Sequence, residues 1–388
     1  MTMVKRNPDI AFTRNPVCFA DDGLPGPPRR FDVTVGDRPV YSGRYTAPAV
    51  IDVGEIAEAY VAPIPSPEGI PVGDSGVMLQ VEDVTEFEAR LVEVAGEDGE
   101  PLMADFFALP GGISPQNFRK LKELDTDIFA ARLLDKRRNF FLTTRTHGWT
   151  IVFDELEVYP LVFACLHDED SEITVRAAGT EFAVTAGPVM RGIYSIDIRA
   201  ARRKIAVDHG FLASVFEVIY DGYTACRIVI RETAPERDTT LVRFRNSMGV
   251  FELLHLSGEK ESGASPEDAG EALRRYDSVT GRYAGIGRRS VLTRTLTVAT
   301  GFRTEDDMRF ILDMAASEEV YLRDRTGWVR TVPTVERLGL ATPQLKPESI
   351  KVTLTMADDY DSMTPDIADL KDFERPRIFS DQHTDEFN

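Results

Sequence analysis

The sequence predicts a mainly β protein, with two or three antiparallel β-sandwich-like domains and a few short helices. Short runs in which apolar and polar residues alternate dominate the chain, as at Phe31, Val33 and Val35. Turn residues such as Gly36 separate that run from the next, which begins at Val40. The length of 388 residues exceeds the usual size of one domain.

The first part of the chain contains its clearest linker. Residues 51–61 predict the end of a strand and a short helical turn. Residues 62–76 then carry four prolines and three glycines, which disfavour both a helix and a central strand. This segment is either a long surface loop within one domain, which we favour, or an arm that reaches a neighbouring subunit. Strands are expected again at 77–84 and 86–94.

A short helix is expected at 115–124, because Ser114 can cap it and Pro115 suits its first turn. Further along, the pattern predicts a hairpin and then a series of strands. The hairpin would join 139–145 to 149–153 through Thr146, His147 and Gly148. The strands that follow are expected at 172–184, 216–220, 225–232 and 240–245.

The C-terminal part begins after residue 235. Residues 257–271 are acidic and rich in small side chains, so we expect an exposed loop. An alternating strand is expected at 290–300. Thr304 and Asp307 then form a capping-box pattern at the start of an amphipathic helix near 304–316. These patterns divide the chain into domains at 1–168, 169–235 and 236–357, followed by an acidic tail at 358–388.

Charge and cysteine content exclude several classes of protein. The formal net charge of -19 disfavours direct contact with nucleic acid or with anionic membranes. The three cysteines, Cys18, Cys165 and Cys226, are too few and too scattered for a disulfide framework and predict buried, reduced thiols. No stretch is apolar enough to cross a bilayer, and the N-terminus has no signal-peptide pattern. We therefore expect synthesis in the cytoplasm and no membrane insertion.

The usual chemical motifs are missing from the sequence. It contains no GxxxxGK[ST], GxGxxG, GxSxG or HExxH pattern. The run from His167 to Asp170 could bind a divalent cation, but a solvated turn is the favoured interpretation. A glycosidase would need two carboxylates in an aromatic cleft, whereas only Trp149 and Trp328 are present and Trp149 alternates with residues expected in the core. We predict no enzyme activity and no catalytic, cofactor-binding or metal-binding residues.

Several runs, in this order and spacing, resemble a family of proteins encoded in the structural modules of tailed phages and prophages of anaerobic gut bacteria. The resemblance extends from about Phe12 to Met356, although no single motif is strongly specific. Its segments are FTRNPV at 12–17, IDVGEIAEAY at 51–60, GGIS at 111–114, TDIFAARLL at 126–134, FFLTTR at 140–145, ELEVYPLVF at 155–163, RGIYSIDI at 191–198 and VRFRNSMGVFELLHLSG at 242–258.

The resemblance implies a virion structural protein of the tail, its tip or its baseplate, with no catalytic residues to carry over. Its expected partners are other phage structural proteins and further copies of itself, as a homo-oligomer. One alternative is a carbohydrate-binding or glycan-cleaving receptor-binding β-protein, which an aromatic groove with paired carboxylates would favour. Another is a bacterial cell-surface β-sandwich module, against which the missing signal peptide counts.

Overall fold

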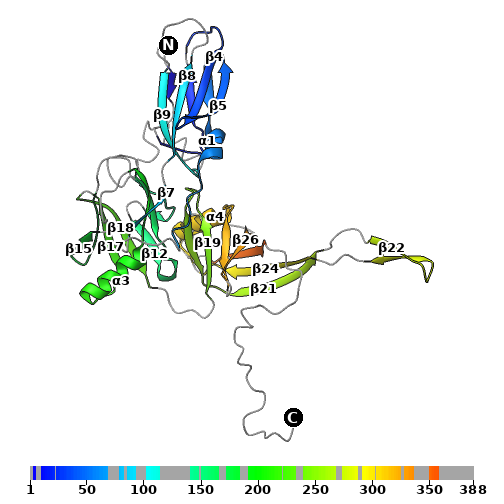
Figure 1. Cartoon of the computed structure of the whole chain (residues 1–388). Helices are drawn as coiled ribbons and strands as arrows, with labels where there is room; N and C mark the ends of the chain where they lie inside the picture. The colour runs from blue at the N-terminus through cyan, green and yellow to red at the C-terminus, as the bar shows by residue number, and fades with distance from the viewer. Residues whose placement is uncertain are drawn as a thin grey trace, which may run out of the picture.

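The computed structural model describes residues 3–5, 10–21, 23–68, 78–82, 85–92, 102–113, 140–147, 150–165, 172–183, 191–220, 222–232, 239–267, 273–286, 291–301, 303–324, 327–335 and 349–357. Figure 1 shows three β-rich bodies that meet at the centre of the molecule and an arm that projects to one side. The predicted mainly β class is confirmed. Two strand pairs are parallel rather than antiparallel, β2 with β9 and β12 with β18.

The N-terminal body is a sandwich of two sheets. Apolar side chains from both sheets form its core. The ring centroids of Phe19 and Phe31 lie 5.6 Å apart, and Phe87 stacks on Phe106 with ring centroids 5.1 Å apart. Its described strands and helix are β1 (Met3–Lys5), β2 (Ile10–Phe12), β3 (Cys18–Asp21), β4 (Arg29–Val35), β5 (Arg38–Tyr45), β6 (Ala49–Asp52), α1 (Gly54–Tyr60), β8 (Thr85–Val92) and β9 (Leu102–Leu109).

The middle body also has two sheets, and helix α3 (Ile198–His209) packs on its core. The four-stranded sheet has the order β10 (Phe140–Phe141), β13 (Leu161–Cys165), β16 (Gly192–Ile196) and β7 (Met78–Glu82). The six-stranded sheet has the order β11 (Thr146–His147), β12 (Thr150–Asp154), β18 (Tyr223–Arg231), β17 (Val215–Tyr220), β14 (Ile173–Ala177) and β15 (Thr180–Ala183). A short 3-10 helix, η2 (Glu155–Glu157), follows β12.

The C-terminal body is one seven-stranded sheet with a helix on one face. Helix α4 (Glu305–Ala315) buries Met308, Ile311 and Met314 against the sheet, as its periodicity predicts. Thr304 and Asp307 form the predicted capping box. The strand order is β20 (Phe251–Leu256), β19 (Thr240–Arg245), β25 (Val320–Arg323), β26 (Trp328–Val335), β27 (Lys351–Met356), β24 (Val291–Ala299) and β21 (Lys260–Glu267).

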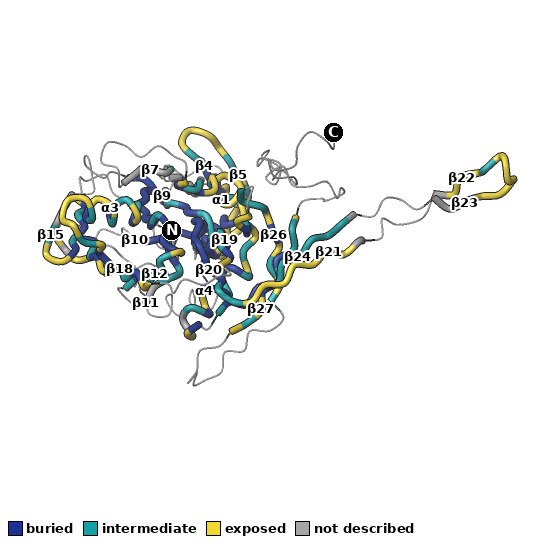
Figure 2. Tube along the Cα trace, turned by 90° about the horizontal axis from the view of Figure 1, so that it is seen from below, coloured by how far each residue is buried: buried dark blue, intermediate teal, exposed yellow. Residues whose placement is uncertain are grey.

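The arm extends from the edge of this sheet. Strands β21 and β24 continue outward, and beyond them lies a two-stranded hairpin of β22 (Leu273–Asp277) and β23 (Arg282–Ile286). Figure 2 shows that buried residues concentrate where the three bodies meet, whereas the described residues of β21 and of the hairpin are mostly exposed. The loop predicted at 257–271 is therefore wrong for 260–267, which form an edge strand. The predicted exposure is confirmed for residues 260–265.

Two further predictions need correction. The hairpin of 139–145 with 149–153 does not form, because Phe140 and Phe141 pair with β13 and only 146–147 pair with β12. The residues between them leave the sheets to bind buried carboxylates. Helix α3 was not predicted, although Asp197 caps it by accepting a hydrogen bond from the Ala200 amide at 2.9 Å and Gly210 ends it at φ +74°. The helix expected at 115–124 lies outside the described residues.

The sheets also show how the predicted domain limits relate to strand pairing. Strand β13 pairs with β16 and strand β12 with β18, so strands before and after residue 168 share sheets. Strand β7 crosses in the same way, since it lies in the sequence between β6 and β8 of the N-terminal body yet pairs with β16. Chain order and spatial order therefore differ in the first two bodies.

Candidate functional site

Five of the segments that carry the family resemblance meet at a junction between the three bodies. Asn15 accepts a hydrogen bond from the Ile113 amide and donates one to its carbonyl, both at 2.8 Å. The Gly112 amide in turn donates to the Ser247 carbonyl at 2.6 Å. Gly111, at φ +94°, permits this approach, because a Cβ atom there would lie 2.3 Å from the Ser247 oxygen. The loop at 110–113 thus joins the N-terminal body to the turn between β19 and β20.

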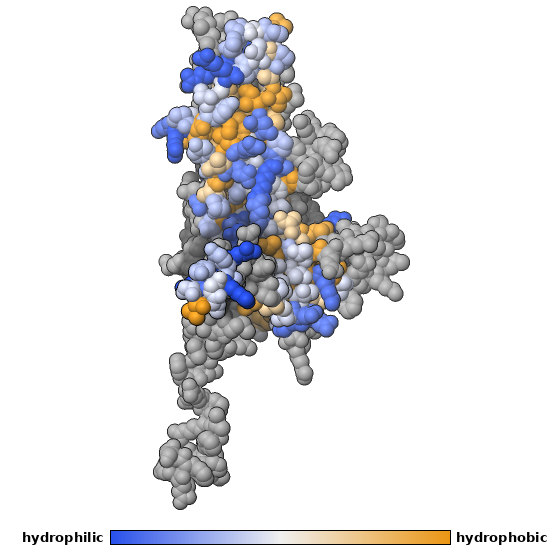
Figure 3. All heavy atoms as spheres, turned by 90° about the vertical axis from the view of Figure 1, so that its right-hand side faces the viewer, coloured by the Kyte–Doolittle hydropathy of each residue, from blue (hydrophilic) through white to orange (hydrophobic). Residues whose placement is uncertain are grey.

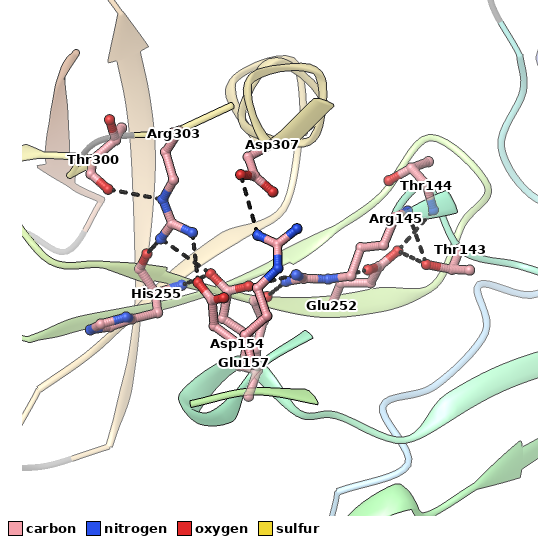
Figure 4. Close-up of polar contacts among 12 residues, drawn as sticks. Thr143, Thr144, Arg145, Asp154, Glu157, Glu252, His255, Thr300, Arg303 and Asp307 are labelled. Atoms are coloured by element: carbon pink, nitrogen blue, oxygen red, sulfur yellow. Dashed lines mark hydrogen bonds and ion pairs between the residues drawn. The ribbon is translucent and has the colours of Figure 1, made fainter. Parts of the chain in front are cut away.

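An ion-pair network lies behind this loop, and Arg145 is at its centre. The Arg145 guanidinium donates from Nη1 to Glu157 at 2.5 Å, from Nε to Glu252 at 3.0 Å, and from Nη2 to the Leu253 carbonyl. Its charge also lies 3.8 Å from the ring centroid of Phe310 on α4. Arg145 therefore links the middle body to both the sheet and the helix of the C-terminal body (Figure 4).

A second guanidinium approaches Glu157 from the opposite side of the network. Arg303, just before α4, donates to Asp154 at 2.8 Å, to Glu157 at 3.4 Å and to the carbonyls of Thr300 and His255. Glu157 also accepts a hydrogen bond from the His255 amide at 2.8 Å. Figure 4 shows the two arginines converging on Glu157 from different elements. This carboxylate, with 3% of its side chain exposed, is the common partner of both.

Three carboxylates and two guanidinium groups share the network, and their pKa values respond differently. Burial alone would raise the pKa of Glu157, but Arg145, Arg303 and the His255 amide outweigh it and lower that pKa. Burial raises the pKa of Glu252 against the opposing effect of Arg145. Burial and the neighbouring charge of Glu157 raise the pKa of Asp154. Glu157 is thus the member held most firmly in its ionised form.

The network suits positioning better than chemistry. Glu252 accepts hydrogen bonds from Thr143, Thr144, Asn246 and Arg145, so its oxygens are fully engaged. Thr144 and Ser247 both donate to Asp313 on α4, which adds another link between bodies. A cavity of about 880 Å³ opens beside the junction. Its rim carries ion pairs of Arg14 with Glu58 and Glu318, so charges that face it already have partners.

The Pro-rich segment lies against the other face of the C-terminal sheet. Ile64 is completely buried, its carbonyl accepts from Arg245 at 2.8 Å, and Glu68 pairs with Arg243 at 2.9 Å. The favoured prediction of a loop within one domain is therefore wrong for residues 62–68, which contact the C-terminal body of the same chain, and 69–76 lie outside the described residues. Arg243 also lies 4.7 Å from the ring centroid of Trp328, and Arg323 lies 5.4 Å from it. The chain's own cations therefore occupy this aromatic ring, which a sugar-binding groove would need.

The hairpin at the end of the arm is exposed, whereas the junction is buried. Arg274, Arg275 and Arg282 are exposed on it, and none has an ion-pair partner among the residues that the structure describes. Tyr276 and Tyr283 face one another across the strands with ring centroids 5.3 Å apart, and they are 55% and 71% exposed. This basic and aromatic surface packs on no other strand of the described chain.

The turn of the hairpin is well defined despite its exposure. Asp277 accepts hydrogen bonds from the Val279 amide at 2.9 Å and the Thr280 hydroxyl at 2.8 Å, and these bonds lower its pKa. Gly281 adopts φ +64° and donates to the Asp277 carbonyl at 2.9 Å. The tip therefore presents a fixed shape, and Val279, which is 92% exposed, stands at its end.

The remaining predicted residues are placed as follows. The run from His167 to Asp170 and Trp149 lie outside the described residues. Among the residues that are described, no group of three His, Cys, Asp or Glu could hold a metal ion, and no helix is long and apolar enough to cross a membrane. Cys165 and Cys226 are buried as predicted, and burial raises the pKa of Cys226, whereas Cys18 is partly exposed.

Apolar side chains also gather on the N-terminal body, on the side of the molecule from which the arm projects (Figure 3). Tyr41 and Val50 are exposed on this body, with 37% and 56% of their surfaces accessible. Nothing in the structure indicates what would cover Tyr41 and Val50, so we assign no function to this surface.

No protein-family model matches the chain, and no curated protein matches it. Among solved structures, a chain from the virion of a native gene transfer agent particle aligns with 32% of this chain and 95% of its own length, at 14% identity and a TM-score of 0.21. A chain from the tail of an empty gene transfer agent particle aligns with 34% of this chain and 99% of its own, at 14% identity and a TM-score of 0.22.

A third solved structure concerns the retention of a 1.5-MDa bacterial ice-binding adhesin at the host cell surface. It aligns with 75% of this chain and 88% of its own, at 9% identity and a TM-score of 0.16. The chain thus has partial, low-identity structural similarity to gene transfer agent tail particles. At these scores the similarity carries no argument about function.

Proposed function

We propose that this chain is a structural protein of a phage-like tail that works through contacts with other proteins. The observation that carries the proposal is the projecting hairpin. Three arginines and two tyrosines are exposed on β22 and β23 and a valine on the turn between them, and the hairpin pairs with no other described strand. An ordered pair of strands that presents aromatic and arginine side chains has the composition typical of the energetic centre of a protein interface.

The edge of the arm supports contact through its tip rather than along its length. Strand β21 is an edge strand, and its residues 260–265 are exposed. Its sequence includes Lys260 and Pro266, a charge and a proline of the kind that discourage pairing with a strand of another molecule. We infer that the shaft of the arm stays unpaired and that the hairpin makes the contact.

The junction supplies the rigid frame that such an arm needs. Arg145, Glu157 and Arg303 connect the middle body to the C-terminal sheet through buried ion pairs. The C-terminal sheet, from which β21 and β24 extend into the arm, is therefore fixed to the middle body. A hairpin that contacts a different surface of the next copy makes a heterologous contact, and repetition of such a contact gives a ring or a helical filament.

On this basis we propose a homo-oligomer that joins other tail proteins at the tail tip or baseplate, and we propose no catalytic role. The test is native mass spectrometry of the full chain, alone and with tail proteins of the same particle, beside a variant in which Gly-Ser replaces residues 273–286. We expect the full chain to form a discrete oligomer or complex that the variant does not form. If both proteins stay monomeric and neither enters particles, the proposal is wrong.

A further inference from the structure

We propose that the acidic C-terminal segment, residues 358–388, binds the β22–β23 hairpin of its own chain and shields it before assembly. The inference rests on the proposed function, because it assigns a means of control to the same contact surface. The hairpin combines exposed arginines, which have no ion-pair partner among the described residues, with two exposed tyrosines. The C-terminal segment is acidic and follows β27, the last strand that the structure describes.

The hairpin has the chemistry to bind an acidic, apolar peptide. Its three arginines and Asp277 give residues 273–286 a formal charge of +2 in a chain whose total is -19. The cross-strand register places Arg274, Tyr276 and Tyr283 on one face. The Asp277 carboxylate is engaged by its own turn, so it competes little for the arginines. The sequence beside the hairpin is acidic on one side, with Asp268 and Glu271, and basic on the other, with Arg288 and Arg289.

The C-terminal segment has the complementary composition. Residues 358–388 contain ten aspartates and glutamates against three lysines and arginines. Apolar residues such as Ile367, Leu370 and Phe373 are interspersed among the acids, so the segment can offer carboxylates to the arginines and apolar side chains to the tyrosines. Long-range attraction between opposite charges would also speed the encounter.

The segment leaves the sheet beside the base of the arm. Thr355 on β27 pairs with Thr295 on β24, the strand that continues into the arm, and the Ala357 amide donates to the Arg330 carbonyl at 3.0 Å. From Thr295 to the hairpin turn, a fully extended chain would span about 45 Å, at about 3.3 Å per residue. The 31 residues of the segment can span about 100 Å on the same scale. The segment can therefore reach the hairpin of its own chain.

Because residues 358–388 belong to the same chain as the hairpin, their binding is favoured over that of the C-terminal segment of a second copy. A flexible tether that can span two sites gives a millimolar effective concentration, on the order of a thousand times that of a micromolar solution of free copies. In dilute protein the tether would keep the hairpin covered. In a growing particle, where the acceptor is held in place and repeated, the acceptor would displace the segment.

The experiment uses a fluorescent peptide of residues 358–388 and measures its anisotropy with three proteins at low salt. These are the full chain, the chain ending at Ala357, and that shortened chain with Arg274→Gln, Arg275→Gln and Arg282→Gln. We expect the shortened chain to bind the peptide and the full chain to bind it about tenfold or more weakly, because its own segment competes. The triple variant should lose binding, and added salt should weaken it.

A matched control removes three positive charges elsewhere on the surface. Arg199→Gln, Arg203→Gln and Lys204→Gln on the exposed face of α3 change the net charge equally, and this shortened variant should bind the peptide normally. Equal binding to both triple variants, or equal binding to the full and shortened chains, overturns the proposal. Preferential binding of the hairpin to single-stranded DNA over the peptide would also overturn it.

Hydrogen exchange separates the self-contact from an exchange of tails between copies. At a concentration where native mass spectrometry shows only monomers, amides of residues 273–286 should exchange more slowly in the full chain than in the shortened chain. If protection appears only when oligomers form, the occupant is a second copy and the self-contact is wrong. Oligomer formation is measured separately by native mass spectrometry. If the hairpin binds the peptide but does not affect oligomer formation, the proposed function is wrong and the self-contact is not.

Discussion

The junction and the hairpin use arginine in opposite ways. Arg145 has only 6% of its side chain exposed, and its guanidinium contacts two carboxylates, a carbonyl and an aromatic ring. Arg274, Arg275 and Arg282 are exposed and have no ion-pair partner among the described residues. The comparison shows that the junction pairs its arginines within the chain, whereas the described part of the arm leaves its arginines exposed to solvent.

The largest effect is expected at the centre of the junction. Glu157→Gln leaves Arg145 and Arg303 buried without the carboxylate that they share, so the free energy of unfolding should fall by about 3–5 kcal/mol. Urea denaturation followed by circular dichroism measures the loss. Glu252→Gln is the matched control, because the pKa of Glu252 is raised and its neutral form is tolerated better. Equal losses in the two variants would contradict the central role of Glu157.

A smaller effect is expected where the N-terminal body meets the turn after β19. Gly111→Ala introduces a Cβ atom 2.3 Å from the Ser247 carbonyl oxygen in a left-handed backbone conformation, and should destabilise by about 1–3 kcal/mol. Gly179→Ala provides the control, since it has a similar φ of +83° and no atom within 4 Å. The thermal unfolding temperature should drop more for Gly111→Ala, and the difference isolates the steric contact from the backbone strain.

The cap of α4 should contribute less again. Thr304→Ala removes the hydroxyl that accepts from the Asp307 amide, and the free energy of unfolding should fall by about 1 kcal/mol. Thr304→Ser retains the hydroxyl and should stay near the native value. Urea titrations of the two variants provide the measurement, and a loss in the serine variant equal to that in the alanine variant would show that the methyl group, rather than the cap, matters.

The free energy of unfolding should also depend on pH, and Glu157 and Glu252 in the junction should contribute with opposite signs. The lowered pKa of Glu157 adds stability above its ordinary pKa of 4.5, and this is lost as the pH falls through the folded-state value. The raised pKa of Glu252 acts in reverse, because folding binds a proton and stability falls as the pH rises from 4.5 through the folded-state value. Relative to the native chain, Glu252→Gln should therefore gain stability as the pH rises. Unfolding curves between pH 4 and 8 test the sign.

The smallest effect on stability is expected at the hairpin. Tyr276→Ala with Tyr283→Ala removes two exposed rings, so the free energy of unfolding should change by no more than about 0.5 kcal/mol. The same variant should lose the oligomer or complex seen by native mass spectrometry. A loss of stability comparable to that of Glu157→Gln would show that the hairpin packs on the body, and the contrast between the two regions would disappear.

The sequence predicts local structure here far better than it predicts the junction. The β class, the strand at 291–299 and the capping box at Thr304 follow from alternation and local spacing. Arg145 and Glu252 are 107 positions apart, and only the fold brings them together. The order and spacing of the resemblance segments were the available signal, since five of them meet at the junction. The hairpin was missed because no short-range pattern distinguishes an exposed arm from an exposed loop.

Strand β7 has a consequence for how the protein is made. It ends at Glu82, and its partner β16 begins at Gly192, so about 110 residues must be translated before the pair can form. At about 5–20 residues per second, β7 waits on the order of 5–20 s beside a ribosome without its partner. Host chaperones that bind unpaired strands would therefore meet this segment early. Translation speed between codons 82 and 192 should influence how much of the protein reaches the native state.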